Sequence, residues 1–372
     1  MTLYDPCPNY SLFHVSYSDD LIATFNEILF TSYEFYYNIV PYFAPVNIAA
    51  NLFAALLLLL MKELRNPFNL ILSIMCLSSI LPLIIRVSLV YRKMMVNGIC
   101  NVETQTYSIA VHTLLEVNTW AAFRSFYTWM DVVLTALRFR ALRFKGKWEP
   151  SYALALSATA LVAVISTAAD IPVYFTNVIM SFPVDQVCGG NPDVVGNQEL
   201  VPATGWSDSM FSDNCLLYQQ YQWISGIIHN TLPALLLLIF TLLLIFEILR
   251  AHNSHMAVAA RSAKKSDDAR NAAIILTIIA LLTLLSELPQ GFACLANAVF
   301  PVGFWYMYTY KLYMLWMIIQ IFSTSCNLII TLVMSNNFRK AARGMIFCRK
   351  KNNTSSPTVS VISGTKIASL KN

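Results

Sequence analysis

Long apolar segments alternate with short polar ones along most of the chain. A helix needs about 20 residues to cross roughly 30 Å of hydrocarbon, and seven segments reach that length: residues 39–61, 67–90, 107–137, 152–176, 220–249, 271–299 and 305–334. Ionisable side chains interrupt the third segment, but no turn signal breaks it, and Leu, Val, Phe and Trp surround them. The pattern predicts an all-α membrane protein built as a bundle of seven transmembrane helices.

The composition agrees with this architecture. Of the 372 residues, 57% are hydrophobic and 12% are charged, and the mean hydropathy is +0.56. The charged share is about half that of an ordinary soluble domain. The composition therefore excludes a disordered chain, a collagen-like repeat and a conventional cytosolic enzyme, and one helix bundle replaces the two or three domains that length alone would suggest.

Basic residues orient the bundle, because short cytoplasmic loops collect Lys and Arg. Residues 1–38 and 181–216 contain none, whereas 20 of the 25 basic residues fall in four stretches: 62–66, 138–147, 250–270 and 339–372. The N-terminus is therefore expected outside and the C-terminus inside, and the first helix acts as its own insertion signal. Three parts follow: an extracellular tail (1–38), the seven-helix domain (39–336), and a short amphipathic cytoplasmic helix with its tail (337–372).

The outer segments carry acidic residues without basic neighbours in the same segment. In the N-terminal tail they are Asp5, Asp19, Asp20, Glu27 and Glu34, and between the fourth and fifth helices they are Asp185, Asp193, Glu199, Asp208 and Asp213. An anionic mouth attracts cationic ligands and speeds their arrival. Acidic outer loops also follow from the positive-inside rule alone, so both explanations stay open. Asn9 begins a glycosylation triplet on the outer side.

The cysteines divide according to this topology. Cys7, Cys100, Cys188 and Cys215 lie on the outer side, where they are free to oxidise. We expect Cys100 to pair with Cys188 or with Cys215, and four cysteines leave the choice open. Cys348 adjoins a basic run and is a predicted palmitoylation site, because a lipid chain and a polybasic patch together give stable anchoring.

Ionisable residues in the predicted spans indicate functional positions, since charge at membrane depth is costly. Arg124, Asp131 and Arg138 are spaced by seven and therefore share one stripe of the third helix. This stripe must face the bundle core. In the sixth helix Glu287 stands two residues before Pro289, where a kink would form a hinge. For each polar residue taken alone, structural satisfaction inside the bundle is the competing explanation.

Several motifs resemble those of rhodopsin-like G-protein-coupled receptors. They are Asn51 in the first helix, Asn66-Pro67-Phe68-Asn69 in the second, Leu137-Arg138-Phe139 in the third, and Asn327 in the seventh. The runs 124–130 and 287–291 are similar to those of the nematode serpentine receptors of class W. That family is similar to receptors for FMRFamide-like and myosuppressin-like peptides. The resemblance covers residues 39–348 and implies a seven-helix receptor fold.

The resemblance implies three groups of site residues. The ligand pocket and its switch would comprise Glu116, Arg124, Tyr127, Glu287, Pro289 and Gln290. Arg138 and Phe139 would contact the G protein. A central polar network would comprise Asn51, Ser79, Asp131 and Asn327.

Arg124 and Glu287 are expected to form a pair at the pocket floor. Arg124 lies 14 residues before Arg138, about 21 Å along the helix, at the depth where the resemblance puts that floor. An unpaired charge there would be costly, whereas a guanidinium and a carboxylate can satisfy each other through two parallel hydrogen bonds. A ligand would compete for the pair and bias the hinge at Pro289. A purely structural pair, or direct contact between Glu287 and a ligand arginine, are the alternatives.

Three positions depart from the superfamily pattern. Ser79 stands where the second helix usually has an acidic residue, Leu137 precedes Arg138 in place of an acidic residue, and Asn327 is not followed by proline. These changes argue against a standard sodium site. We expect Asp131 to supply the missing negative charge and to bond Asn327 or a water molecule. Without an acidic neighbour to hold Arg138, raised basal signalling is also expected.

Other function classes fit the sequence less well. A transporter would show repeated halves, and neither a repeat nor an even number of helices is present. The lysine that an opsin needs is Ile321 here, and His252 and His255 lie in a basic cytoplasmic loop without converging ligands. We therefore expect a multi-pass plasma-membrane receptor that is not an enzyme and needs no cofactor, metal or nucleic acid. Its partners would be a short cationic neuropeptide, a heterotrimeric G protein and the lipid bilayer. A chemosensory receptor for a small environmental molecule is the alternative.

Overall fold

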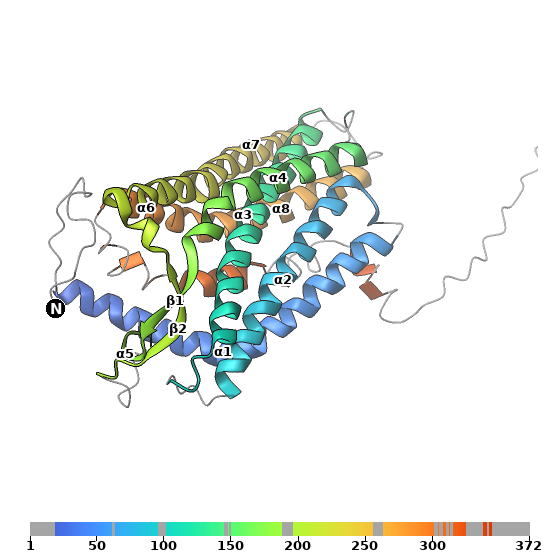
Figure 1. Ribbon diagram of the computed structural model, residues 1–372. Coiled ribbons are helices and arrows are strands. Elements are labelled where there is room, and N and C mark those ends of the chain that lie inside the picture. The colour runs from blue at the N-terminus through green and yellow to red at the C-terminus, as the bar shows by residue number, and fades with distance from the viewer. Residues whose placement is uncertain are drawn as a thin grey trace, which may run out of the picture.

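The chain folds into a bundle of long helices (Figure 1). The computed structural model describes residues 19–61, 64–95, 102–144, 148, 150–187, 196–255, 263–300, 304, 308–309, 312, 315–324, 338–340 and 342–343. Each predicted membrane segment contains a helix in this part of the chain: α1 (Asp19–Leu60), α2 (Pro67–Met95), α3 (Tyr107–Arg143), α4 (Tyr152–Thr176), the continuous stretch of α6 (Ser212–Ile224), η4 (Ser225–Thr231) and α7 (Leu232–His255), then α8 (Ala263–Val299) and helical residues 315–324. The predicted all-α membrane architecture is confirmed.

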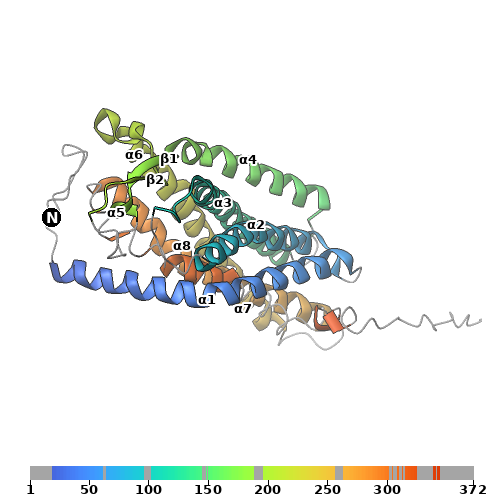
Figure 2. The same ribbon diagram turned by 60° about the horizontal axis from the view of Figure 1, so that its bottom comes forward.

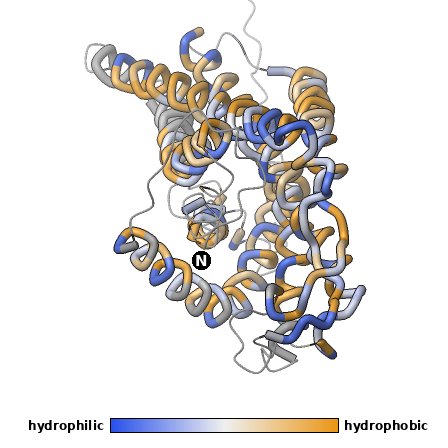
Figure 3. Tube along the Cα trace, turned by 60° about the vertical axis from the view of Figure 1, so that its left-hand side comes forward, coloured by the Kyte–Doolittle hydropathy of each residue, from blue (hydrophilic) through white to orange (hydrophobic). Residues whose placement is uncertain are grey.

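Five of these helices are long and apolar enough to cross a membrane by hydropathy alone. Within the described residues they are Asn38–Leu60, Pro67–Arg92, Tyr152–Thr176, Ser212–Arg250 and Thr277–Val299. The 37-residue α3 does not meet the criterion, because its charged stripe lowers its hydropathy. Large apolar side chains such as Leu161, Val164, Phe246 and Leu285 are exposed on the flanks, and hydrophobic positions run along the helices (Figure 3). These flanks are suited to contact lipid.

The first helix begins well before the predicted membrane span. It starts at Asp19 and projects beyond the rest of the bundle (Figure 2). The Phe25 ring contacts the Tyr308 ring with centroids 5.0 Å apart, and Tyr36 is buried. Hydropathy did not reveal this extension, because polar residues interrupt it. The extension packs on the outer end of the seventh segment.

A β-hairpin covers the outer end of α3. Strand β1 (Asn177–Pro183) pairs antiparallel with β2 (Leu200–Trp206), and the short helices α5 (Val184–Val187) and η3 (Asp208–Met210) follow the two strands. The Thr204 hydroxyl donates to the Ala110 carbonyl of α3 at 3.0 Å. The sequence analysis did not predict this hairpin, which places the acidic loop over the outer end of the bundle.

The fifth membrane helix, which consists of α6, η4 and α7, contains two departures from regular α-helical geometry. Asp213, Asn214 and Cys215 have positive φ angles near its start, a conformation that non-glycine residues rarely adopt. Cys215 is disulfide-bonded and is buried beside Tyr218, and both interactions help to hold this turn. Further along, η4 is a π-helix of seven residues.

The cytoplasmic end closes around the residues that follow the seventh helix. Residues 338–340 and 342–343 are helical, where a short amphipathic helix is predicted. Phe338 and Ala342 are buried against Leu57 and Leu58 of α1. This contact joins the end of the described chain to the first helix.

Candidate functional site

Arg124 of α3 and Glu287 of α8 form an ion pair inside the bundle. Arg124 Nε lies 3.0 Å from Oε2 and 3.3 Å from Oε1 of Glu287, and Nη2 lies 2.5 Å from Oε2. The side chains are only 16% and 5% exposed. The contact and its parallel hydrogen bonds are those expected from the sequence, whereas a role in ligand switching stays a prediction.

Two amide side chains also contact this pair. Arg124 Nη2 also donates to Oδ1 of Asn230 in η4. From the seventh helix, Gln320 Nε2 donates to Glu287 Oε1 at 3.0 Å and to Gln290 Oε1 at 3.3 Å. The pair therefore connects α3, η4, α8 and residues 315–324. Sequence reasoning missed Gln320, although a lone amide in an apolar span is itself a signal of internal hydrogen bonding.

Two glycines bring η4 and α8 close enough for this network. A Cβ atom on Gly291 would lie 2.8 Å from Thr231 Oγ1 and 3.1 Å from Asn230 Cβ. A Cβ atom on Gly226 would lie 2.9 Å from Leu295 Cδ2. Each glycine thus permits an approach that an alanine would prevent. The final glycine of the 287–291 motif thereby acquires a packing reason.

The π-helical geometry of η4 presents two neighbouring polar residues to the interior. His229 and Asn230 are both buried. The Leu232 N–H bonds to Ile227, five residues earlier, and the next residue, Pro233, has no N–H to offer Ile228. The Trp129 indole N–H of α3 donates to the Ile228 carbonyl instead, at 3.2 Å. A tryptophan side chain therefore supplies the hydrogen bond that the proline removes.

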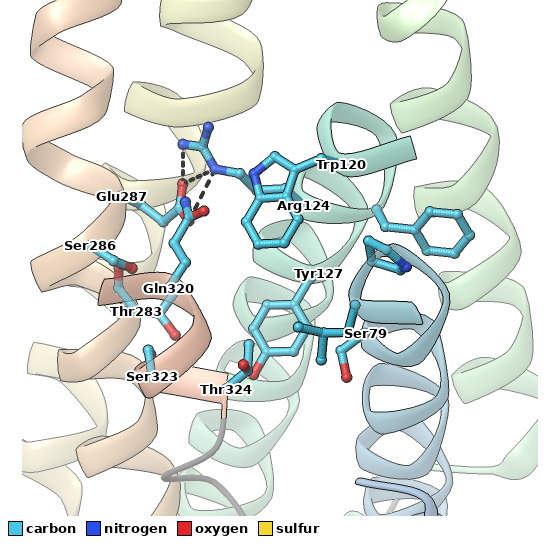
Figure 4. Close-up of a pocket in the computed structure, with 13 residues that line it drawn as sticks. Ser79, Trp120, Arg124, Tyr127, Thr283, Ser286, Glu287, Gln320, Ser323 and Thr324 are labelled. Carbon is cyan, nitrogen blue, oxygen red and sulfur yellow. Dashed lines mark hydrogen bonds and ion pairs between the residues drawn. The ribbon is translucent and has the colours of Figure 1, made fainter. Parts of the chain in front are cut away.

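A cavity lies between α2, α3, α8 and the seventh membrane helix, residues 315–324 (Figure 4). The space between its walls, counted together with its open mouth, is about 540 Å³. Its wall combines the aromatic rings of Trp120, Phe123 and Tyr127 with the hydroxyls of Ser79, Thr283, Ser286, Ser323 and Thr324. Arg124, Glu287 and Gln320 also line it, so that a bound group would touch the ion pair directly.

Glu116 occupies a second ion pair. Its Oε1 accepts from Arg86 Nε of α2 at 2.7 Å, and the fully buried Arg86 guanidinium stacks 3.8 Å above the Trp120 ring. Trp120 lines the cavity, but Glu116 does not. Glu116 instead positions Arg86 and, through it, Trp120, and a direct role of Glu116 in ligand binding stays a prediction. Arg86 was missed as a site residue.

Three of the four residues of the predicted central network lie in the described part of the chain. Asn51 Nδ2 donates to Asn47, which in turn donates to the Ile321 carbonyl of the seventh helix at 3.2 Å, whereas Ser79 donates to the Cys76 carbonyl. Asn327 lies outside the described residues. Within the described residues these hydrogen bonds do not join Asn51 or Ser79 to Asp131.

Asp131 is fully buried in α3. Thr283 of α8 faces it, but that hydroxyl donates to the Ile279 carbonyl at 3.1 Å. Neither carboxyl oxygen of Asp131 accepts a hydrogen bond in the described part of the chain. The predicted bond to Asn327 or to water stays a prediction.

At the cytoplasmic end, Arg138 stacks on an aromatic ring. Its Cζ lies 3.7 Å from the centroid of Phe68 in α2, a cation–π geometry, and the neighbouring Phe139 is half-buried. Phe68 thus packs against the guanidinium of Arg138, which has no acidic neighbour at Leu137. Raised basal signalling stays a prediction.

Four predicted site residues besides Asn327 lie outside the described residues: Asn9, Cys100, Cys188 and Cys348. The disulfide at Cys215 agrees with one of the two pairings considered, and its partner stays a prediction.

The helix bundle and the polar cavity inside it are the features of a multi-pass membrane receptor. A family model described as Serpentine type 7TM GPCR chemoreceptor Srw matches residues 36–349, and the chain belongs to this family. The chain is also similar to the Caenorhabditis elegans protein named G-protein coupled receptor dmsr-1, with 25% identity over 235 residues. That match covers 59% of this chain and 44% of the relative, so the chain spans less than half of the relative's length.

Family membership confirms the resemblance derived from the sequence motifs. The protein is a multi-pass plasma-membrane receptor, and its family consists of receptors rather than enzymes. Membership in a family described as 7TM receptors places the chain in a lipid bilayer, and a heterotrimeric G protein stays a predicted partner.

Proposed function

We propose that the receptor is activated by a short cationic neuropeptide that binds from the outer side. The observation that supports this proposal is the charge of the hairpin region. Between residues 177 and 216 there is no Lys or Arg, while Glu199, Asp208 and Asp213 are exposed. Their combined field attracts cations and raises association rates.

The ligand would act on the Arg124 network by population shift. A receptor with two conformations responds only to a ligand that binds one of them better. A ligand side chain in the cavity would touch Arg124, Glu287 and Gln320, and these residues belong to three helices. Displacing any of their bonds changes the balance between packings of α3 and α8. Pro289 lies two residues from Glu287 and provides the hinge.

The test is a library of amidated peptides screened with a G-protein reporter in cells that express the receptor. Each active peptide would be compared with an analogue in which citrulline replaces arginine, because citrulline keeps the shape and removes the charge. Cationic peptides should activate, and their citrulline analogues should be much weaker. Activation that is equal for both members of each pair would contradict the proposal.

A second candidate is a chemosensory receptor for a small environmental molecule. The apolar and aromatic wall of the cavity favours it, because a small apolar molecule would contact that wall without needing the acidic hairpin region. Substituting Glu199, Asp208 and Asp213 by their amides distinguishes the two. Such a ligand would keep its potency, whereas a cationic peptide would lose potency.

A further inference from the structure

We infer that a second cavity, between α3, α4 and η4, is the subsite for the basic group of the ligand, a guanidinium or ammonium whose hydrogen bonds Asp170 and His229 accept. The inference rests on the proposed function and names the residues that would recognise the ligand's charge. The space of this cavity, counted together with its opening, is about 310 Å³, and it is lined by Arg124, Asp170, Ser225, His229 and Asn230 among others. Arg124 lines both cavities.

The hydrogen bonds of His229 leave an unpaired acceptor in this cavity. Its Nε2 lies 3.3 Å from the Ala169 carbonyl, which can only accept, so that Nε2 carries the proton. In the neutral ring Nδ1 is then an acceptor. This Nδ1 lies 3.4 Å from Oδ1 of Asp170, so that with the ring neutral and the carboxyl ionised two acceptors face each other. A donor placed beside both atoms would satisfy them together.

Asp170 is the carboxylate with capacity for a ligand. It is 1% exposed, and neither of its oxygens has a hydrogen-bond donor within the described residues. A buried carboxylate without donors is costly. Guanidinium and ammonium groups both offer several N–H donors and a positive charge, which match two carboxylate oxygens and an imidazole nitrogen.

The other buried carboxylates of the described chain are less suited to this role. They are Asp131 and Glu287. Glu287 already accepts from Arg124 and Gln320, and Asp131 borders neither cavity. The alternative in which a ligand arginine contacts Glu287 would require breaking these bonds first. Asp170 can accept a cation without losing a hydrogen bond.

The local charge also favours a cation. Arg124 and Glu287 balance each other, so the carboxylate of Asp170 leaves a net negative charge between α3, α4 and η4. Arg124 is close enough for its charge to act on Asp170. A bound cation would neutralise the carboxylate of Asp170. The attraction between Arg124 and Asp170 would then weaken, and Arg124 would depend more on its ion pair with Glu287. The subsite is thus coupled to the ion pair without touching Glu287.

The subsite lies below the hairpin. Ala121, Val173 and Tyr221 line its outer side, and β1 begins at Asn177, one turn beyond Val173. Asn177 Nδ2 donates to the Val173 carbonyl at 3.1 Å. The acidic hairpin region, residues 177–216, therefore lies directly outside the cavity, where its charge would attract cations.

The experiment uses the purified full-length receptor in lipid nanodiscs and two probes, N-acetyl-arginine amide and N-acetyl-citrulline amide. Binding is measured as a saturable rise in the unfolding temperature, which follows ligand occupancy. The arginine probe should stabilise the wild type and the citrulline probe should not. Asp170→Asn should weaken the arginine probe about tenfold or more, because charge-assisted hydrogen bonds are about twice as strong as neutral ones.

A cavity-filling variant keeps the test decisive if Asp170→Asn does not fold. Ala121→Leu would fill the second cavity while leaving the carboxylate in place, and it should abolish the response to the arginine probe. Ala122→Leu is the matched control, since Ala122, the alanine next to Ala121, borders neither cavity, and this variant should bind as the wild type does. Equal probe affinity in the wild type, Asp170→Asn and Ala121→Leu overturns the inference, as does a wild type that binds neither probe or both equally.

Peptide activation separates this inference from the proposed function. If cationic peptides activate the wild type, Asp170→Asn and Ala121→Leu with one potency, the receptor function stands and the subsite is wrong. If the arginine probe binds through Asp170 but no cationic peptide activates the wild type, the cation site stands and the peptide function is wrong.

Discussion

Arg124 shows how one side chain can organise several helices. Its guanidinium donates to Glu287 of α8 and to Asn230 of η4, and such forked geometry is specific to arginine. The pairing with Glu287 could be predicted from the sequence, because two opposite charges buried at the same membrane depth are costly unless they pair. The amides of Asn230 and Gln320 could not be assigned, because neutral residues carry no comparable energetic demand.

Charge reversal tests the Arg124–Glu287 pair. Arg124→Glu and Glu287→Arg should each abolish surface expression or signalling, because each leaves two like charges buried together. The double reversal should recover part of the loss, measured by surface labelling and by the G-protein reporter. Glu287→Gln, which keeps the size and one acceptor, should lie between the wild type and the reversals. A double variant no better than the worse single one would show that the residues are not partners.

Phe68 is expected to restrain basal signalling. Phe68→Leu removes the ring beneath Arg138 but keeps an apolar side chain, so the loss of a cation–π contact worth about 0.5–2 kcal/mol should shift the balance toward activity about 2- to 30-fold. Phe68→Tyr retains an aromatic face and should behave as the wild type. Ligand-free reporter activity, normalised to surface expression, measures the effect. Unchanged activity in Phe68→Leu would refute the restraint.

Asp131 is expected to contribute to signalling rather than to folding alone. Its buried carboxyl oxygens have no donor in the described part of the chain, so Asp131→Asn should change the agonist response while surface expression is retained. Thr283→Val, on the facing position of α8, serves as the comparison. An Asn variant with an unchanged response would leave Asp131 as an ordinary buried polar residue.

Hydropathy predicts the membrane helices of this protein but not its outer elements. The membrane helices follow from their apolar runs, since hydrocarbon requires every backbone group to bond within its own segment. The outer part of α1 and the β1–β2 hairpin lie beyond the hydrocarbon, where tertiary contacts such as Phe25–Tyr308 and Thr204–Ala110 determine the structure. Long-range contacts of this kind leave no periodic signature in the sequence, and the hairpin was missed for that reason.

The packing of η4 against α8 gives a prediction at this scale. Gly291→Ala places a Cβ atom in contact with Thr231 and Asn230, and overpacking of this kind costs about 1–3 kcal/mol. The unfolding temperature of the solubilised receptor should fall. Thr231→Ala removes the closest atom, so the double variant Gly291→Ala/Thr231→Ala should recover stability. If Gly291→Ala is as stable as the wild type, the close approach is not required.

Charge is distributed unequally between the two ends of the molecule, as the sequence indicates. Basic residues gather in the stretches predicted to be cytoplasmic, and the hairpin region is acidic. The sequence could not show that the hairpin stands over α3, nor that two cavities meet at Arg124. Both depend on how the helices cross, and that crossing is set by close contacts such as those of Gly226 and Gly291.

The acidic hairpin should act mainly on association rate. Replacing Glu199, Asp208 and Asp213 by amides should reduce the potency of a cationic peptide about tenfold through slower binding, with little change in dissociation. Because salt screens exposed charges over about 8–10 Å, the difference should shrink as ionic strength rises. Kinetic binding measurements at two salt concentrations check this, with the citrulline analogue as control. A difference that is insensitive to salt would point to direct contacts instead.

The π-helical η4 also affects how the fifth helix is counted. A π-turn absorbs about one extra residue while the helix on either side keeps its direction. Positions before Ser225 and after Thr231 therefore obey the same 3.6-residue period with an offset of about one residue. A relative whose fifth helix is one residue shorter would retain both flanks and lose the adjacent pair formed here by His229 and Asn230. Chain length within this helix, and not only residue identity, would then distinguish receptors that can accept a cation beside Asp170 from those that cannot.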